Sequence, residues 1–112
     1  MGGIKKRIYT RPVTFGGPTD EGSPHFKFKK DIKIAFTGVA CFDEEDISIE
    51  IELYLLKKKI RPGMNDLDNF IKPIIDALDE EKIIQEHQMG FISIKRIIVS
   101  DPNEEGIQVT IK

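Results

Sequence analysis

The stretch "DISIEIELYLL" (residues 46–56) alternates apolar and mostly polar residues with a period of two. This period places successive side chains on opposite faces of an extended chain, so it is typical of a strand with one face buried. The stretch predicts the clearest strand of the chain, and the other elements are placed outward from it. The apolar positions of the pattern are Ile47, Ile49, Ile51, Leu53 and Leu55.

A helix is predicted after a basic loop, "KKKIRPG" at 57–63. Between 66 and about 82, apolar residues recur at helical spacing, which favours an amphipathic helix with one buried face. Asp66, Asp68 and Asn69 are all good N-cap residues. Since proline is tolerated in the first turn, Pro73 predicts that the regular helix starts near residues 69–72.

Two further strands are predicted towards the C-terminus, "GFISIKRIIVS" (90–100) and "GIQVTIK" (106–112). The segment between them, "DPNEE" (101–105), is rich in turn-forming residues. A turn of this length between two apolar runs indicates a β-hairpin.

The N-terminal part is less regular. Residues 1–25 contain several glycines and prolines and predict an arm or loop, with room for one short strand at 7–14. Residues 26–40 fit both a helical and an extended period, and we favour the helix. The chain is then one domain, residues 1–112, of α+β class: a small mixed or antiparallel sheet of about four strands with two helices on one face.

Composition narrows the class of protein. A chain of 112 residues with 39% hydrophobic and 32% charged residues can bury one modest core. It has no apolar run of about 20 residues and no apolar signal segment, so neither a membrane nor secretion is expected. The single cysteine, Cys41, excludes an internal disulfide and a cysteine-based zinc site, which favours a cytoplasmic location.

The net charge of −2 argues against simple nonspecific binding of nucleic acid, but the charges are clustered. Basic runs occur at 5–11, 27–33, 57–61 and 95–96, and acidic ones at 43–46, 66–81 and 101–105. A nearly neutral total can therefore hide a basic face. Each lysine run, taken alone, is more often a solvated face than a binding patch.

Asp66 and Asp68 stand two residues apart at the helix entrance. In an extended segment such side chains point the same way, so both can converge on one ion. Mg²⁺ prefers oxygen ligands and usually takes one or two carboxylates, water and phosphate oxygens. Glu86, just before the 90–100 strand, offers a third carboxylate, and Lys72 a point charge for phosphate.

The alternative is that these acids only cap the helix. Carboxylates at a helix N-terminus accept backbone N–H bonds and complement the helix dipole without binding any ion. Glu86 would then be an ordinary surface residue, and Asp76 and Asp79 a solvated helix face.

The segment "NDLDNFIKPIIDAL" (65–78) resembles the D-x-D-N-x-x-K-x-x-x-D-A-L signature of the RusA-type Holliday junction resolvases, endonucleases often carried by prophages. The later D-D-x-Q-V element of the family is similar to "QEHQM" (85–89), with Gln85 at the first aspartate and Glu86 at the second. The resemblance covers roughly residues 46–96, and the N-terminal part follows the family only loosely.

The resemblance implies Mg²⁺-dependent hydrolysis of phosphodiesters at four-way DNA junctions by a homodimer, with Mn²⁺ as a possible substitute. Its metal-binding acids fall on Asp66, Asp68 and Glu86, and its catalytic lysine on Lys72. Two departures, glutamate in place of aspartate at 86 and the neutral Gln85, leave open a family member that binds branched DNA without cutting it. The basic residues expected along the DNA path are Lys5, Lys6, Arg7, Arg11, Lys57, Lys58, Lys59, Arg61 and Lys95.

Overall fold

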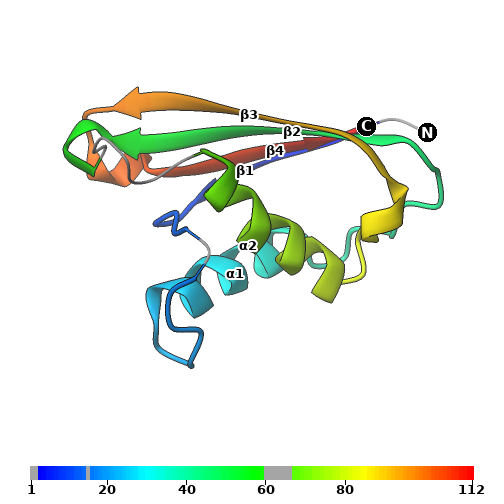
Figure 1. Cartoon of the computed structure of the whole chain (residues 1–112), viewed down its shortest axis with the longest axis horizontal. Helices are drawn as coiled ribbons and strands as arrows, with labels where there is room; N and C mark the ends of the chain where they lie inside the picture. Colours follow the sequence, from blue (N-terminus) through cyan, green and yellow to red (C-terminus); the bar gives the residue numbers. More distant parts are fainter. Residues whose placement is uncertain (1–2, 15, 60–66) are drawn as a thin grey trace.

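The computed structural model describes residues 3–14, 16–59 and 67–112, except the side chain of residue 59. Four strands, two helices and three short 3₁₀ turns follow one another along the chain (Figure 1). In chain order they are β1 (Ile4–Tyr9), α1 (Pro24–Ala35), β2 (Ile47–Leu56), η1 (Lys57–Lys59), α2 (Leu67–Glu80), η2 (Glu86–Gln88), β3 (Met89–Val99), η3 (Pro102–Glu104) and β4 (Gly106–Ile111).

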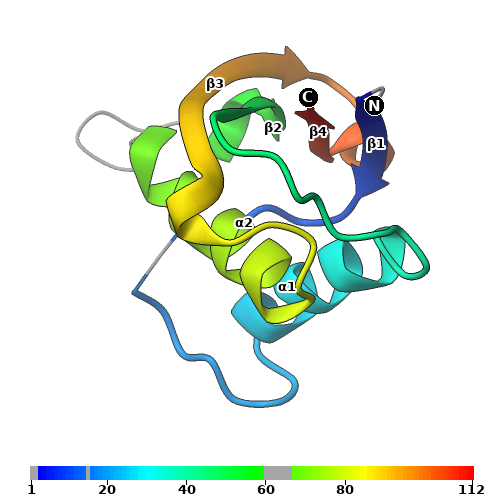
Figure 2. The ribbon, with the colours of Figure 1, turned by 90° about the vertical axis from the view of Figure 1, so that its right-hand side faces the viewer.

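The four strands form one mixed sheet in the order β1-β4-β2-β3. β2 runs parallel to β3 and antiparallel to β4, and β4 runs antiparallel to β1. Figures 1 and 2 show both helices on the same face of the sheet. The expected α+β class, with about four strands and two helices on one face, is confirmed.

The predicted hairpin between the last two strands is wrong, because β3 and β4 lie on opposite sides of β2. The residues expected to form a tight turn instead form the 3₁₀ turn η3, and β2 lies between the two strands. The 100–105 connection therefore passes the end of β2, where Leu56 pairs with Val99. There the carboxylate of Glu105 accepts the N–H of Leu56 at 3.4 Å.

The predicted N-terminal arm contains an edge strand, and the short strand expected at 7–14 lies earlier, at β1. Ile8 pairs with Ile107 of β4 and is 5% exposed, so it adds a buried contact that fixes the strand. At the adjoining end of β4, a Cβ on Gly106 would lie 2.0 Å from the carbonyl oxygen of Ile8. Only glycine allows this close approach of the two strands.

The helical interpretation of residues 26–40 is confirmed for 26–35 by α1, whereas 36–40 lie beyond the end of the helix. Ser23 caps its N-terminus, since the Ser23 hydroxyl accepts the N–H of Phe26 at 3.1 Å. Pro24 occupies the first turn, where a missing N–H costs nothing. Phe28 and Ile32 are fully buried on the face that packs towards the sheet and α2.

α2 begins at Leu67, earlier than Pro73 led us to expect, and Pro73 lies inside the helix. The proline removes only the hydrogen bond to the carbonyl of Asn69, in the first turn. Its ring is buried together with Phe70 and Ile74, so packing of the apolar face offsets the lost bond. Asp68 consequently belongs to the first helical turn.

The helices and the covered face of the sheet enclose one continuous apolar cluster to which all four strands contribute. The opposite face of the sheet carries no described helix (Figure 1). Neither described helix has the length and apolar character needed to cross a bilayer.

Candidate active site around α2 and η2

The predicted site residues fall on two elements. Asp68 and Lys72 are exposed residues of α2, in its first turn and one turn later. Glu86 is exposed in η2, which immediately precedes β3. Asp66 lies outside the described residues, so its place in the site remains a prediction.

Lys72 is paired along its own helix. Its ammonium nitrogen donates a hydrogen bond to Asp76 Oδ1 at 2.8 Å. This hydrogen bond and the charge of Asp76 raise the pKa of Lys72, and the carboxylates of Glu86 and Asp79 act in the same direction. The ammonium group of Lys72 thus shares one electrostatic environment with Glu86, although η2 is a separate segment of the chain.

Gln88 holds η2 in place. It is 7% exposed, and its side-chain amide donates to the carbonyl of Phe42 at 2.7 Å and to that of Glu44 at 3.0 Å. Its amide oxygen accepts the backbone N–H of Gln85 at 2.8 Å. The first two bonds join η2 to the segment before β2, the third closes η2 on itself, and together they fix the backbone that carries Glu86.

Sequence reasoning gave Gln88 no role. The only signal was its match to the glutamine of the D-x-Q-V-like element, which marks a family position but not a buried anchor. The side-chain capacity of glutamine, donor and acceptor at once, suits this task.

Asp68 and Glu86 are not brought together with a third described acid. β3 pairs beside β2 in parallel, so its start at Met89 lies beside Ile47 at the start of β2. α2 begins after the end of β2, and Figure 1 shows η2 near the last turns of α2. Within the described ranges, no three histidine, cysteine or acidic side chains lie close enough to hold a metal ion.

The carboxylates of Asp68 and Glu86 are suitable ligands for a hard cation, but their positions do not bring them to one ion. Asp68 and Glu86 offer exposed carboxylate oxygens, the ligands that Mg²⁺ prefers, with room for bound water. Asp68 lies in the first turn of α2, whereas η2, which carries Glu86, lies near its last turns. The predicted set of three acids therefore depends on Asp66.

The uncovered face of the sheet holds a polar row across all four strands. Register places Arg7, Gln108, Glu52 and Lys95 opposite one another in β1, β4, β2 and β3. Glu52 accepts a hydrogen bond from Gln108 at 3.0 Å and lies 3.5 Å from the ammonium nitrogen of Lys95. Lys95 is exposed and in an ion pair with Glu52, not an isolated cation.

Arg7, which we expected on a DNA path, has structural contacts instead of a free guanidinium. The group stacks between the rings of Tyr9 and Tyr54, 4.3 and 3.9 Å from their centroids. It also donates to the carbonyl oxygens of Ile8, Ile107 and Glu104, at 3.1, 3.3 and 2.6 Å. These contacts tie β1 to the start of β4 and to η3.

Burial raises the pKa of Tyr54, and the hydrogen bond that its hydroxyl donates to Glu52, at 2.9 Å, raises it further. The phenol therefore stays neutral on this face, where it supports both Arg7 and the polar row.

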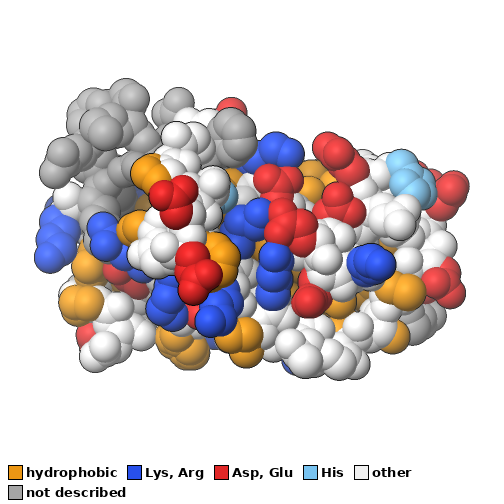
Figure 3. All heavy atoms as spheres, turned by 90° about the horizontal axis from the view of Figure 1, so that it is seen from below, with side chains coloured by type: hydrophobic (Ala, Val, Ile, Leu, Met, Phe, Trp, Pro, Cys, Tyr) orange, Lys and Arg blue, Asp and Glu red, His pale blue; other side chains and the backbone are white. Residues whose placement is uncertain are grey.

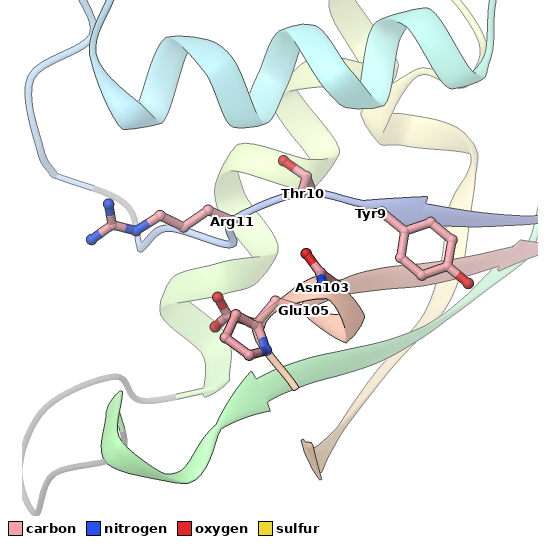
Figure 4. Close-up of a pocket in the computed structure, with 6 residues that line it drawn as sticks. Tyr9, Thr10, Arg11, Asn103 and Glu105 are labelled. Atoms are coloured by element: carbon pink, nitrogen blue, oxygen red, sulfur yellow. The ribbon is translucent and has the colours of Figure 1, made fainter. Parts of the chain in front are cut away.

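A polar pocket of about 250 Å³ lies where β1 ends beside the η3 connection. Thr10 and Arg11 line it from one side and Asn103 and Glu105 from the other, and Figure 4 shows the Arg11 side chain extending away from the others. Thr10 is held by its hydroxyl, which donates to Asp31 at 2.7 Å. Arg11 is thus an exposed cation on a fixed backbone.

The other basic residues predicted to bind DNA differ in their exposure. Lys5, Lys57 and Lys58 are exposed, and Lys6 is half-buried on β1. Arg61 and the side chain of Lys59 lie outside the described part. On the helical face, Figure 3 shows lysine and arginine interspersed with acidic side chains, not gathered in one patch.

The chain matches no protein-family model, and no curated protein matches its sequence.

Proposed function

We propose that the protein is a Mg²⁺-dependent endodeoxyribonuclease that resolves four-way DNA junctions by paired phosphodiester hydrolysis. The signature at 65–78 supports this function, since it combines two carboxylates and a lysine in the spacing of a resolvase site. The observation that carries the proposal furthest is that Asp68 and Lys72 are both exposed on α2, in its first turn and one turn later. An ammonium group close to acidic side chains suits a reaction on a phosphate.

In this proposal Asp66 and Asp68 hold the divalent ion at the entrance of α2, and Glu86, which lies near the last turns of α2, acts on Lys72 and not on the ion. A bound Mg²⁺ would supply a polarising charge for the scissile phosphate and an activated water. Lys72, protonated at neutral pH, stabilises negative charge on the phosphate oxygens. Gln88 positions the backbone of Glu86 and does not itself contact the substrate.

DNA is held mainly through its backbone, by exposed cations of β1, the segment after β1, η1 and β3. Lys5, Arg11, Lys57, Lys58 and Lys95 are available for phosphate contacts, and binding through them weakens as salt increases. Since a four-way junction is resolved by two matched cuts, the active species is a two-fold dimer. The proposed substrate places the protein in the cytoplasm, together with the DNA.

A second candidate is a protein that binds branched DNA without cutting it. The separation of Asp68, in the first turn of α2, from Glu86 favours this alternative. Such a protein would keep the exposed cations and the dimer but would need no ion.

A cleavage assay separates the two. The wild type is incubated with a synthetic four-way junction and with a linear duplex of the same arm sequence, with Mg²⁺, Mn²⁺ or chelator. The nuclease predicts paired nicks in the junction alone, dependent on the metal. Junction binding in a gel-shift experiment without nicks under any metal supports the binding protein and contradicts the nuclease.

A further inference from the structure

β3 forms one edge of the sheet. Ten of its 11 residues pair with β2 on one side, Gly90 being skipped at a register shift, and no other described strand pairs with it. An edge of this length presents a row of unpaired backbone N–H and C=O groups, which invites pairing with another strand.

The side chains of β3 are unusually apolar for an exposed edge. Phe91, Ile92 and Ile98 are 55%, 37% and 53% exposed, although large apolar residues of strands are normally covered. The strand contains no proline, and its only charges are Lys95 and Arg96. Natural sheets usually protect a free edge with charges, prolines or short length.

The other edge of the sheet is protected in this way. β1 has six residues, and three of them, Lys5, Lys6 and Arg7, are basic. The contrast indicates that the β3 edge is covered in the working protein, whereas the β1 edge is not.

We infer that β3 is the dimer surface, and that it pairs antiparallel with β3 of a second copy of this chain. The choice of a second copy as the occupant rests on the proposed function, which needs a two-fold dimer. A strand edge is self-complementary under a two-fold axis, because each strand offers the same alternating donors and acceptors to the other. The two four-stranded sheets then join into one, with all helices on the same face.

The charges of β3 select the register. Full overlap of residues 89–99 with 99–89 of the other copy centres the two-fold axis on Ile94. In this register Lys95 lies opposite Ser93 of the second copy and Arg96 opposite Ile92. A shift of the axis to Lys95 or to Arg96 would place that cation opposite itself, which is unfavourable.

The same register gives one of the three exposed apolar side chains an apolar partner, while Ile92 lies opposite Arg96 and Ile98 opposite Gly90. Phe91 lies opposite Ile97 of the second copy on the uncovered face of the sheet, where an aromatic and a β-branched residue make a favourable cross-strand pair. The longest overlap, the separation of like charges and the apolar pairing thus agree on one axis.

The dimer also sets the distance between the two candidate sites. Each η2, with Glu86, directly precedes its own β3, so the two lie at opposite ends of the joined strands. The two strand starts are separated along the interface by about 33 Å, from ten residue steps of roughly 3.3 Å. This spacing assigns one strand of a junction to each site.

Sedimentation equilibrium of the full chain over a range of concentrations tests the surface with charge variants. Ile92→Lys places a second cation opposite Arg96 of the other copy, so the dissociation constant of the dimer should rise about 100-fold or more. The double variant Ile92→Lys with Arg96→Glu restores opposite charges and should recover the dimer. The control is Ile34→Lys, which changes an isoleucine of α1 that is 60% exposed and lies away from β3. It should leave the dissociation constant of the dimer unchanged.

A wild type that stays monomeric at every concentration overturns the inference, as does an Ile92→Lys variant that dimerises like the wild type. Failure of the double variant to recover the dimer, while its far-UV circular dichroism and melting remain normal, overturns the register. Because oligomeric state is measured without DNA or metal, these outcomes are independent of whether the protein cuts junctions.

Discussion

The ammonium nitrogen of Lys72 lies 2.8 Å from Oδ1 of Asp76, one turn further along α2. The cation proposed to face the scissile phosphate is therefore already held by a carboxylate of its own helix. This pairing keeps Lys72 charged and restrains its direction, two properties that a phosphate-binding lysine needs. It also gives Asp76, which resembled a solvated helix residue, a part in the site.

Replacement of Asp76 by asparagine should lower the pKa of Lys72. The hydrogen bond and the charge of Asp76 are the largest influences that raise this pKa, and the variant removes the charge. NMR titration of the Lys72 side-chain resonances checks the shift, with Asp31→Asn, which breaks the comparable pair with Lys27, as the control. An unchanged Lys72 pKa would contradict this account. If cutting requires protonated Lys72, the alkaline limb of the pH profile of DNA cleavage should lie at lower pH in Asp76→Asn than in the wild type.

Glu80→Gln should destabilise the fold at neutral pH and have little effect in acid. Glu80 joins the helices by ion pairs with Lys29 and Lys33 of α1. Burial acts to raise the pKa of Glu80, but the two lysines outweigh it and lower the pKa below 4.5. A carboxylate with a lowered pKa stabilises the fold above its ordinary pKa, and this contribution is lost as the pH falls through the folded value.

Because Glu80 is nearly half exposed, the expected loss at neutral pH is at most about 1 kcal/mol. Urea unfolding of both proteins across the acid range measures it, with Glu81→Gln as the matched control. A difference between Glu80→Gln and the wild type that persists undiminished in strong acid would exclude the ion-pair explanation.

Arg7→Lys should lower stability by about 1–3 kcal/mol, since lysine cannot stack between Tyr9 and Tyr54 while donating to three carbonyls. Thermal melting compares it with Lys5→Arg, a change of the same kind at an exposed position of β1. If Arg7 were instead a phosphate ligand, the variant would melt like the wild type and bind junction DNA more weakly.

Gln88→Ala should lower the free energy of unfolding by about 1–3 kcal/mol, because it leaves the carbonyls of Phe42 and Glu44 without their side-chain donor. In the proposed nuclease it should also reduce cutting about tenfold at a temperature where the variant is folded, since η2 then positions Glu86 less firmly. His87→Ala, a change at an exposed position of the same turn, is the control for both measurements. Unchanged melting would remove the proposed anchoring role.

Local patterns were sufficient to predict β2 and α2. The strict alternation of β2 and the helical spacing from Phe70 to Leu78 follow directly from burial on one face. The neighbours of each strand were not predictable in the same way, since the turn residues at 101–105 suit a hairpin and a crossing connection equally. The alternation of β2 indicates its buried face but not its strand neighbours, so it does not separate these possibilities.

The candidate site shows the same limit. Asp68, Lys72 and Glu86 were identified by residue type and spacing, but the pairing of Lys72 with Asp76 depends on side-chain direction along α2. Arg7 belongs to a basic run and resembled Lys5 and Lys6. The tyrosines that distinguish it come from β1 itself and from β2, which is distant in the sequence.

Cleavage of a four-way junction by Asp68→Asn, compared with Asp43→Asn, tests the central claim most directly. Both changes remove one exposed carboxylate, but only the first lies in the proposed site. We expect Asp68→Asn to bind the junction like the wild type. Its free energy of unfolding should lie within about 2 kcal/mol of the wild-type value, as for a lost helix-terminal carboxylate. Its Mg²⁺-dependent cutting should fall at least about 100-fold. Asp43→Asn should cut normally. Equal cutting by the two variants would contradict a nuclease site at the entrance of α2.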